Sequence, residues 1–213
     1  MPNEPALSEP NKTYRLVGGA LCLDFCNTVG GKREGVAREN LHSYAHFVAW
    51  CEQAGLLSKA QAIALNKRAT QDPAAASLVL LRALELREAI YRVFFALAHQ
   101  HRTAASDLAV INEELAKTLG RLRISPAPEK HGFTWTWALD VLELDHPLGP
   151  LAHSAANLLI SRDCCAHVRQ CRSDNCGWLF IDSSKNHSRC WCDMRDCGNL
   201  AKVRRHRQKQ RAD

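Results

Sequence analysis

The chain has 213 residues, of which 46% are hydrophobic, and carries a formal net charge of +6. This apolar content is enough for a globular core, so we expect a folded, soluble protein. The most apolar early run, residues 16–31, is interrupted by Asp24 and Asn27 and is too short to span a bilayer, which excludes membrane insertion there.

The N-terminal segment and the cysteines indicate the compartment. The segment is polar and rich in proline, with no apolar stretch after a basic start, so we expect no secretory signal and a cytoplasmic protein without membrane contact. The chain also has ten cysteines. In a reducing compartment, paired cysteine spacings indicate metal binding or catalysis rather than a disulfide framework.

Charge is unevenly distributed along the chain. Residues 1–160 contain 16 Lys and Arg and 16 Asp and Glu, whereas residues 161–213 contain 12 and 6, so the whole excess lies in the last quarter. This shift predicts a boundary near residue 161. We expect a disordered segment over 1–12, a domain over 13–161 and a second module over 165–213.

The first half of the chain contains a stretch of strand formers followed by helical patterns. Residues 14–29 predict one or two short strands. Apolar residues then recur at helical spacing over 41–51, and residues 58–61 fit a capping box that starts the next helix. Asp72-Pro73 opens a long helix that we expect at the centre of the core, and residues 108–119 predict another helix.

A β-hairpin and a further helix follow. Residues 121–125 and 133–139 alternate with period two, which predicts two paired strands. Phe133, Trp135 and Trp137 would share one face of this hairpin. We expect them to cover the helices, although a row of aromatic rings could also stack the bases of a nucleic acid. Residues 147–161 predict an amphipathic helix that leads into the basic quarter.

Four of the cysteines form two matched pairs. Cys171 and Cys176 enclose four residues, Cys192 and Cys197 enclose four, and fifteen residues lie between the pairs. Two short loops of this kind can present four thiolates to one Zn²⁺ in a closed structural site. We expect the metal to fasten a β-hairpin to the start of a helix, because so small a module cannot fold by burial alone.

The other cysteines are predicted to have different roles. Buried free thiols and an iron–sulfur cluster are the alternatives for the paired cysteines, but their polar surroundings disfavour the first and their wide spacing disfavours the second. Cys190 is expected not to bind the metal, because the four paired cysteines already satisfy it. The remaining cysteines are predicted to pack in the core or in a loop; they are Cys22, Cys26, Cys51, Cys164 and Cys165.

The C-terminal module resembles the CGNR zinc finger, a bacterial module named for the motif that begins at its last ligand. Here that motif reads Cys197-Gly198-Asn199-Leu200, and the WLFID run at 178–182 and the AKVRRHR run at 201–207 are also similar. Leu200 departs from the Arg of the family name. Residues 23–28, LDFCNT, resemble the ABATE domain that usually precedes this finger. Together the resemblances imply a stress-linked bacterial transcription regulator.

A run of cations ends the chain. Lys and Arg occupy six of the ten positions from 202 to 211, and a helix there would be largely exposed. Such a helix can lie along phosphates or enter a major groove. The alternatives are a solvated tail, or a positive charge that balances the thiolates. The resemblance favours double-stranded DNA, and the predicted DNA-binding residues are Lys202, Arg204, Arg205, Arg207 and Lys209.

A regulator also needs an input. Asp24, Asn27 and Thr28 are polar residues within an apolar run and could orient a small-molecule effector, although polar residues at such positions more often cap a turn or a helix. Common catalytic and phosphate-binding motifs are absent from the sequence, and a four-thiolate zinc leaves no open coordination position, so we do not expect an enzyme.

These observations predict an α+β protein. Its mainly helical N-terminal domain would contain short strands and a β-hairpin, and its small C-terminal zinc-finger module would contain a β-hairpin and a basic helix. The leading hypothesis is a DNA-binding transcription regulator with one structural Zn²⁺. The first alternative is a protein-interaction module that binds an acidic partner in the transcription machinery. A weaker alternative is an enzyme with a pocket in the N-terminal domain.

Overall fold

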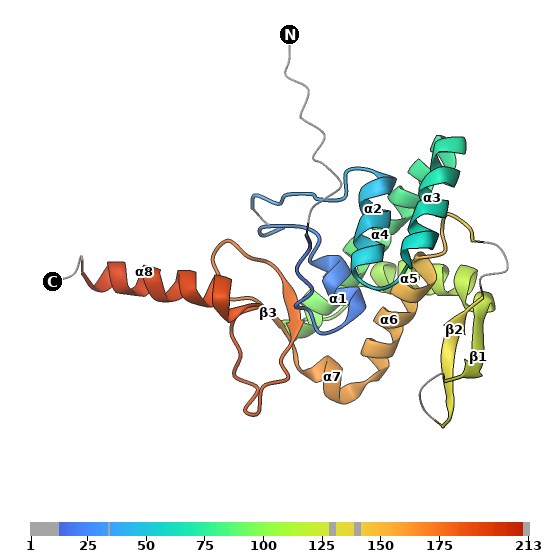
Figure 1. Ribbon diagram of the computed structural model, residues 1–213. Coiled ribbons are helices and arrows are strands. Elements are labelled where there is room, and N and C mark those ends of the chain that lie inside the picture. Colours follow the sequence, from blue (N-terminus) through green and yellow to red (C-terminus); the bar gives the residue numbers. More distant parts are fainter. Residues whose placement is uncertain (1–12, 34, 128–130, 139–141, 211–213) are drawn as a thin grey trace, which may run out of the picture.

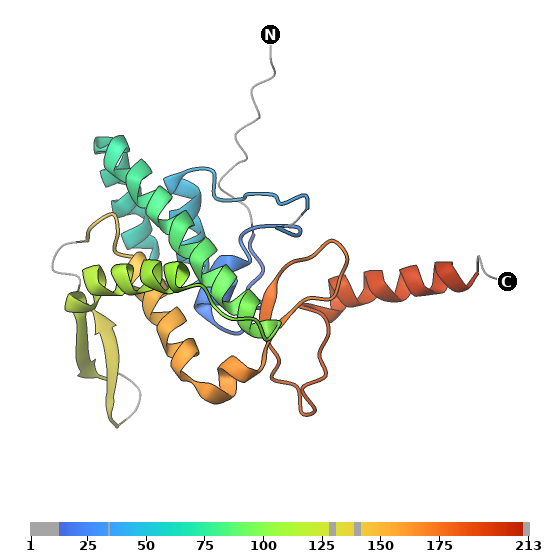
Figure 2. The same cartoon turned by 180° about the vertical axis from the view of Figure 1, so that it is seen from behind.

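The computed structural model describes residues 13–33, 35–127, 131–138 and 142–210 (Figures 1 and 2). The disorder predicted for 1–12 lies outside the described residues. The α+β class is confirmed. The elements in chain order are α1 (Leu21–Cys26), α2 (Tyr44–Gln53), α3 (Lys59–Gln71), α4 (Pro73–Ala98), α5 (Ala105–Thr118), the 3-10 turn η1 (Leu119–Arg121), β1 (Leu122–Pro126), β2 (Phe133–Trp137), α6 (Leu148–Ile160), α7 (Arg162–Ala166), β3 (Val168–Gln170), β4 (Leu179–Ile181), the π-helical turn η2 (Met194–Gly198) and α8 (Asn199–Lys209).

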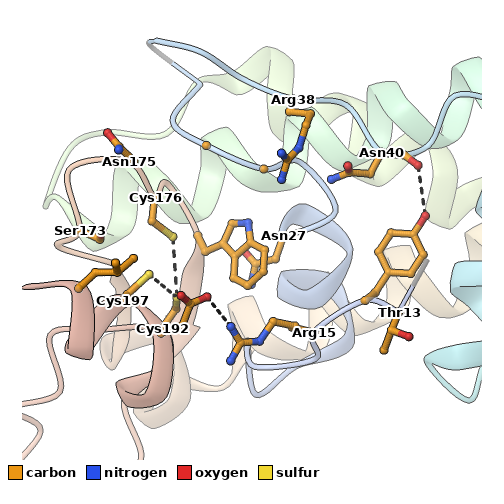
Figure 3. A pocket seen from close by; sticks show the side chains of 16 residues that line it. Thr13, Arg15, Asn27, Arg38, Asn40, Ser173, Asn175, Cys176, Cys192 and Cys197 are labelled. Atoms are coloured by element: carbon orange, nitrogen blue, oxygen red, sulfur yellow. Dashed lines mark hydrogen bonds and ion pairs between the residues drawn. The ribbon is translucent and has the colours of Figure 1, made fainter. Parts of the chain in front are cut away.

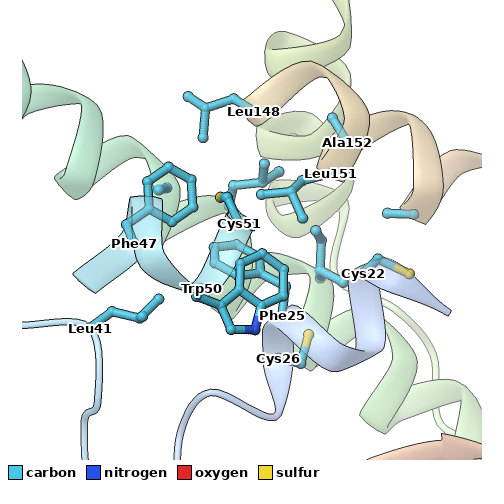
Figure 4. Close-up of a cluster of buried hydrophobic side chains, with 14 of the residues drawn as sticks. Cys22, Phe25, Cys26, Leu41, Phe47, Trp50, Cys51, Leu148, Leu151 and Ala152 are labelled. Atoms are coloured by element: carbon cyan, nitrogen blue, oxygen red, sulfur yellow. The ribbon is translucent and has the colours of Figure 1, made fainter. Parts of the chain in front are cut away.

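The long helix α4 runs through the centre of the core, as predicted. Helices α1, α2, α5 and α6 pack around it. Phe25 of α1, Trp50 of α2 and Leu148 of α6 are fully buried and lie close together (Figure 4). The thiols of α1 and α2 are buried in the same core, as predicted, and burial raises the pKa of Cys22 to about 12. These cysteines are therefore neutral packing groups.

The strand prediction for residues 14–29 is wrong, because the middle of this stretch forms α1. A turn with Gly19 at φ +80° precedes the helix, and the Asp24 carboxylate accepts a hydrogen bond from the Gly18 N–H at 2.7 Å. The helix is short and buried among α4 and α6. A helix buried on most sides lacks the polar face that reveals helical periodicity, so its apolar run looks like a strand.

Local signals at the helix ends are confirmed. The Ser58 hydroxyl accepts a hydrogen bond from the Gln61 N–H, and the Gln61 side chain accepts one from the Ser58 N–H, which completes the capping box of α3. Asp72 caps α4 through the Ala75 N–H at 2.9 Å. Each cap is worth about 1 kcal/mol of helix stability.

The hairpin β1–β2 is confirmed, but its aromatic row does not behave as expected. Trp137 packs on α6, where its ring meets His153 edge to face and crosses closely over Gly149. Trp135 and Phe133 are instead 57% and 77% exposed, so the expectation that they cover the helices is wrong for these two. Figures 1 and 2 show the reason: only the end of the hairpin where β1 starts and β2 finishes meets the helices, and the rest extends away from them.

The short antiparallel pair β3–β4 attaches the C-terminal module to the helices. Val168 and Leu179 from this pair belong to the main hydrophobic core and are fully buried. The hydrophobic core of the N-terminal helices therefore continues past residue 161, where the charge composition changes, into the C-terminal module. In the described part of the chain, no helix has the length and apolar character needed to cross a membrane.

Candidate metal centre and nucleic-acid interface

The structure brings the four predicted metal ligands together. Their sulfur atoms all lie within 4.8 Å of one another, and the four residues are buried. The Cys192 sulfur lies 3.8 Å from that of Cys176 and 3.7 Å from that of Cys197. Four ligands at a Zn–S distance of about 2.3 Å in a tetrahedron place their sulfur atoms about 3.8 Å apart, so the cluster has the dimensions of a closed zinc site.

These four sulfurs can all be ionised together only around a cation. Hydrogen bonds from the Cys176 and Cys192 thiols lower the pKa of Cys171, and the same contact with Cys171 raises the pKa of Cys176 to about 12. Without a cation, one thiolate in the group therefore opposes the ionisation of the next. Zn²⁺ keeps coordinating thiols deprotonated, so all four can be thiolates only around the metal.

Two loops and a π-helical turn position the ligands. The Cys171 N–H donates to the Trp178 carbonyl at 2.8 Å, which closes the first loop between β3 and β4. Cys197 lies within η2, whose first turn is capped by the Asp193 carboxylate. Gly198 follows, and the Met194 side chain packs closely over it, since a Cβ there would lie 2.9 Å from the Met194 sulfur.

The sulfur cluster has a small core of its own. Phe180 is fully buried against the four cysteines, with Val17, Trp178 and Trp191 packed around them. Cys190 does not belong to the group of four sulfurs found among the described residues, in agreement with the prediction that it does not bind the metal. Leu200, which replaces the Arg of the family motif, is 52% exposed at the start of α8.

Asn27 joins the N-terminal domain to the finger. It is 4% exposed, and its side chain makes two hydrogen bonds of 2.9 Å to the backbone of Leu179 in β4, one from its Nδ2 to the carbonyl and one to its Oδ1 from the N–H. The Trp178 indole donates to the Val29 carbonyl at 2.8 Å, and the Gly177 N–H donates to the Gly31 carbonyl at 3.0 Å. The segment after α1 therefore holds the strand that follows the first ligand loop.

The other two predicted ligand-binding residues also make internal contacts. Asp24 caps the Gly18 turn, and the Thr28 hydroxyl donates to the Phe25 carbonyl at 2.7 Å and accepts from Arg87 at 3.1 Å. Arg87 is itself buried and pairs with Glu39 and Glu88. These contacts fit the alternative prediction that polar residues here organise turns, and they leave the effector prediction untested.

Three contacts between the domains carried no recognisable signal in the sequence. Arg15 forms ion pairs with Asp193 and Asp196 of the finger. Gly177 lies against Gly31, and a Cβ at residue 177 would make a tight contact of 3.1 Å with the Gly31 carbonyl oxygen. Trp178 anchors its indole across the domains. All three depend on residues more than 140 positions apart, which local patterns do not reveal.

A cavity of about 340 Å³ opens between the finger and the N-terminal domain; we name it the junction cavity. Figure 3 shows Arg38 and Arg15 reaching toward it from opposite sides, with the cysteines on a third side. Asn27 is the one of the three predicted effector residues that lines it. The full lining comprises Thr13, Tyr14, Arg15, Asn27, Gly30, Gly31, Arg38, Asn40, Ser173, Asn175, Cys176, Trp178, Cys192, Asp196, Cys197 and Leu200.

The predicted basic helix is present as α8 and projects away from the body (Figures 1 and 2). Lys202 and Arg207 are exposed. Arg204 pairs with Asp174 of the finger at 2.5 Å and remains 45% exposed. The side chains of Arg205 and Lys209 lie outside the described residues. The helix thus contacts the finger through Arg204 and presents Lys202 and Arg207 to solvent.

Two family models match the chain. Residues 19–162 match the ABATE family, described as "Putative stress-induced transcription regulator", and residues 167–210 match the CGNR zinc finger. No curated protein matches the chain. Because the finger match contains the whole sulfur cluster, the four cysteines form the site of one structural zinc ion. The chain therefore belongs to the ABATE family and carries a CGNR zinc finger.

Proposed function

We propose that the protein binds double-stranded DNA through the finger and α8, and regulates transcription in this way. The observation that carries the proposal is the basic helix that leaves the zinc cluster with Lys202 and Arg207 in solvent. A helix fixed at one end by a metal site loses less freedom when it docks on a duplex, and its Lys and Arg side chains can neutralise phosphates.

The proposed contacts come from Lys202, Arg204, Arg205, Arg207 and Lys209. Counterion release predicts a log–log salt slope of about −4 to −5 if all five meet phosphates. Arg204 must leave or share Asp174 to do so, which reduces its net contribution. The finger is proposed to act as a binding module rather than as an enzyme, because a four-thiolate zinc offers no position for a substrate.

The test is fluorescence-anisotropy titration of the zinc-loaded protein with random duplex DNA at low and moderate salt. In the test variant Arg204, Arg205, Arg207 and Lys209 become Glu. The control variant carries the same charge change at exposed cations of the N-terminal domain, namely Lys59, Lys67, Arg102 and Arg123. Salt-dependent binding that only the test variant loses supports the proposal, whereas equal loss in both variants indicates a net-charge effect.

The Trp135 and Phe133 face favours a second candidate function, in which the protein also docks on a protein of the transcription machinery. These exposed rings lie on a hairpin that extends from the body. Exposed aromatic groups of this kind are enriched at protein interfaces. If the zinc-loaded protein does not bind DNA, protein docking becomes the leading function. A Trp135→Ser, Phe133→Ser variant should then lose association with the partner.

A further inference from the structure

Three of the four ligand sulfurs border the junction cavity. Cys176, Cys192 and Cys197 line it, whereas Cys171 does not. Cys176 and Cys197 are 8% and 7% exposed, compared with 3% for Cys171 and 2% for Cys192. The metal centre is therefore covered unevenly, and a small solute that enters the cavity meets one side of it.

Two arginines also line the cavity. Arg38 is exposed, and no carboxylate pairs with it among the residues that the structure describes. Arg15, on the opposite side, is already paired with Asp193 and Asp196. Zinc keeps the ligand sulfurs in the thiolate form, which is the form that a peroxide oxidises. In contrast, burial keeps Cys22 neutral.

We propose that this sulfur wall is an oxidation site for small peroxides, where Cys176 and Cys197 react first and Cys192 completes a disulfide. A small neutral peroxide fits the cavity, whereas a bulky oxidant does not reach sulfurs that are less than a tenth exposed. Cys192 lines the same cavity, and its sulfur lies 3.8 Å from that of Cys176 and 3.7 Å from that of Cys197, so it can pair with either.

The reaction balances with hydrogen peroxide as the oxidant. The thiolate sulfur of Cys176 or Cys197 attacks one peroxide oxygen, so that an S–O bond forms, the O–O bond breaks and hydroxide leaves. The sulfur is oxidised by two electrons to a sulfenic acid. The Cys192 thiolate then attacks this sulfur, an S–S bond forms and a second hydroxide leaves. Two thiolates and one peroxide thus yield one disulfide and two hydroxide ions.

Loss of two thiolates removes half of the ligand set. The cluster then no longer holds the metal, and η2 with α8 is no longer fastened to the β3–β4 loop. This chemistry depends only on the cysteine cluster. Its regulatory consequence, the release of DNA on oxidation, rests on the proposed function.

The test uses the zinc-loaded full chain and graded hydrogen peroxide. Zinc release is followed with a chromogenic zinc indicator, and disulfides are mapped by mass spectrometry. We expect one zinc ion released per chain, a Cys176–Cys192 or Cys192–Cys197 disulfide, and recovery with dithiothreitol and zinc. Retained zinc at doses that oxidise the exposed Cys164 would overturn the proposal, as would a disulfide formed mainly through Cys171.

A charge-reversal pair tests the role of the cavity without touching a ligand. Arg38→Glu should slow zinc release about fivefold, because an anion in place of a cation in the cavity lining disfavours the departing hydroxide. Arg102→Glu is the control, since Arg102 is exposed on the loop between α4 and α5. Equal rates in the two variants would contradict access through the cavity. Anisotropy of the untreated protein is measured separately, so that failure to bind DNA leaves the zinc-release result intact.

Discussion

Replacing Asn27 by Ala should loosen the attachment of the finger to the N-terminal domain. Asn27 is nearly fully buried, and its amide satisfies both the N–H and the carbonyl of Leu179. Leu179 is itself 0% exposed, so water does not readily replace the lost partner. The change therefore removes two hydrogen bonds and leaves two buried backbone groups without them.

The expected cost follows from these two groups. A buried donor or acceptor that loses its partner costs about 1–3 kcal/mol, so the pair should lower the free energy of unfolding by about 2–6 kcal/mol. A rearrangement that admits water to the site would place the value at the lower end of this range. Single domains are stable by only about 5–15 kcal/mol, so the effect should be large.

Urea unfolding of the zinc-loaded protein, followed by circular dichroism, measures this cost. Hydrogen exchange of the peptide that contains β4 measures whether the finger has loosened locally. Asn112→Ala is the control, because Asn112 is exposed on α5 and should change stability by no more than about 0.5 kcal/mol. Asn27→Asp should also destabilise at neutral pH, because a carboxylate oxygen would replace the amide donor opposite the Leu179 carbonyl.

One result would refute this reasoning. If Asn27→Ala matches Asn112→Ala in unfolding free energy and keeps the exchange protection of β4, the two hydrogen bonds do not hold the finger. Asn27 would then be available for the other predicted role, as a residue that binds an effector.

Three further outcomes are expected. Cys176→Ser should lower bound zinc well below one per chain by elemental analysis and leave most of the helical dichroism, and stoichiometric zinc would contradict the ligand assignment. Burial raises the pKa of Glu39, but hydrogen bonds from Arg87 outweigh it and hold the pKa below 4.5, so this stabilisation is present above about pH 4.5 and is lost as pH falls through the folded value. Arg87→Met should cost about 3–5 kcal/mol in urea unfolding at pH 7 and weaken that acid dependence, and an unchanged acid dependence would exclude the pair as its source. Gly149→Ala should cost about 1–3 kcal/mol and shift the fluorescence of Trp137, because the new Cβ would lie 2.6 Å from its ring and must displace it; an unshifted spectrum would contradict the close packing of Trp137 on Gly149.

Features that depend on neighbours along the chain could be predicted from the amino-acid sequence. The capping residues of α3 and α4 fixed where those helices begin, because a cap acts on amides within the first turn. Cysteine spacing identified the metal ligands, since the geometry of a zinc site limits how loops of four residues can present sulfur. The basic helix α8 could also be predicted, because its Lys and Arg content alone indicates an exposed helix.

Contacts between distant segments became visible only in the folded chain. Residues 14–29 looked like strands, and it is burial among α4 and α6 that makes α1 a helix. The aromatic row had the pattern of a covering strand, yet the direction of the hairpin leaves Trp135 in solvent. Asn27 could have held a ligand, and its pairing with Leu179, 152 residues away, became visible only when the chain was folded. Such contacts depend on how distant segments pack, and local spacing contains no record of that.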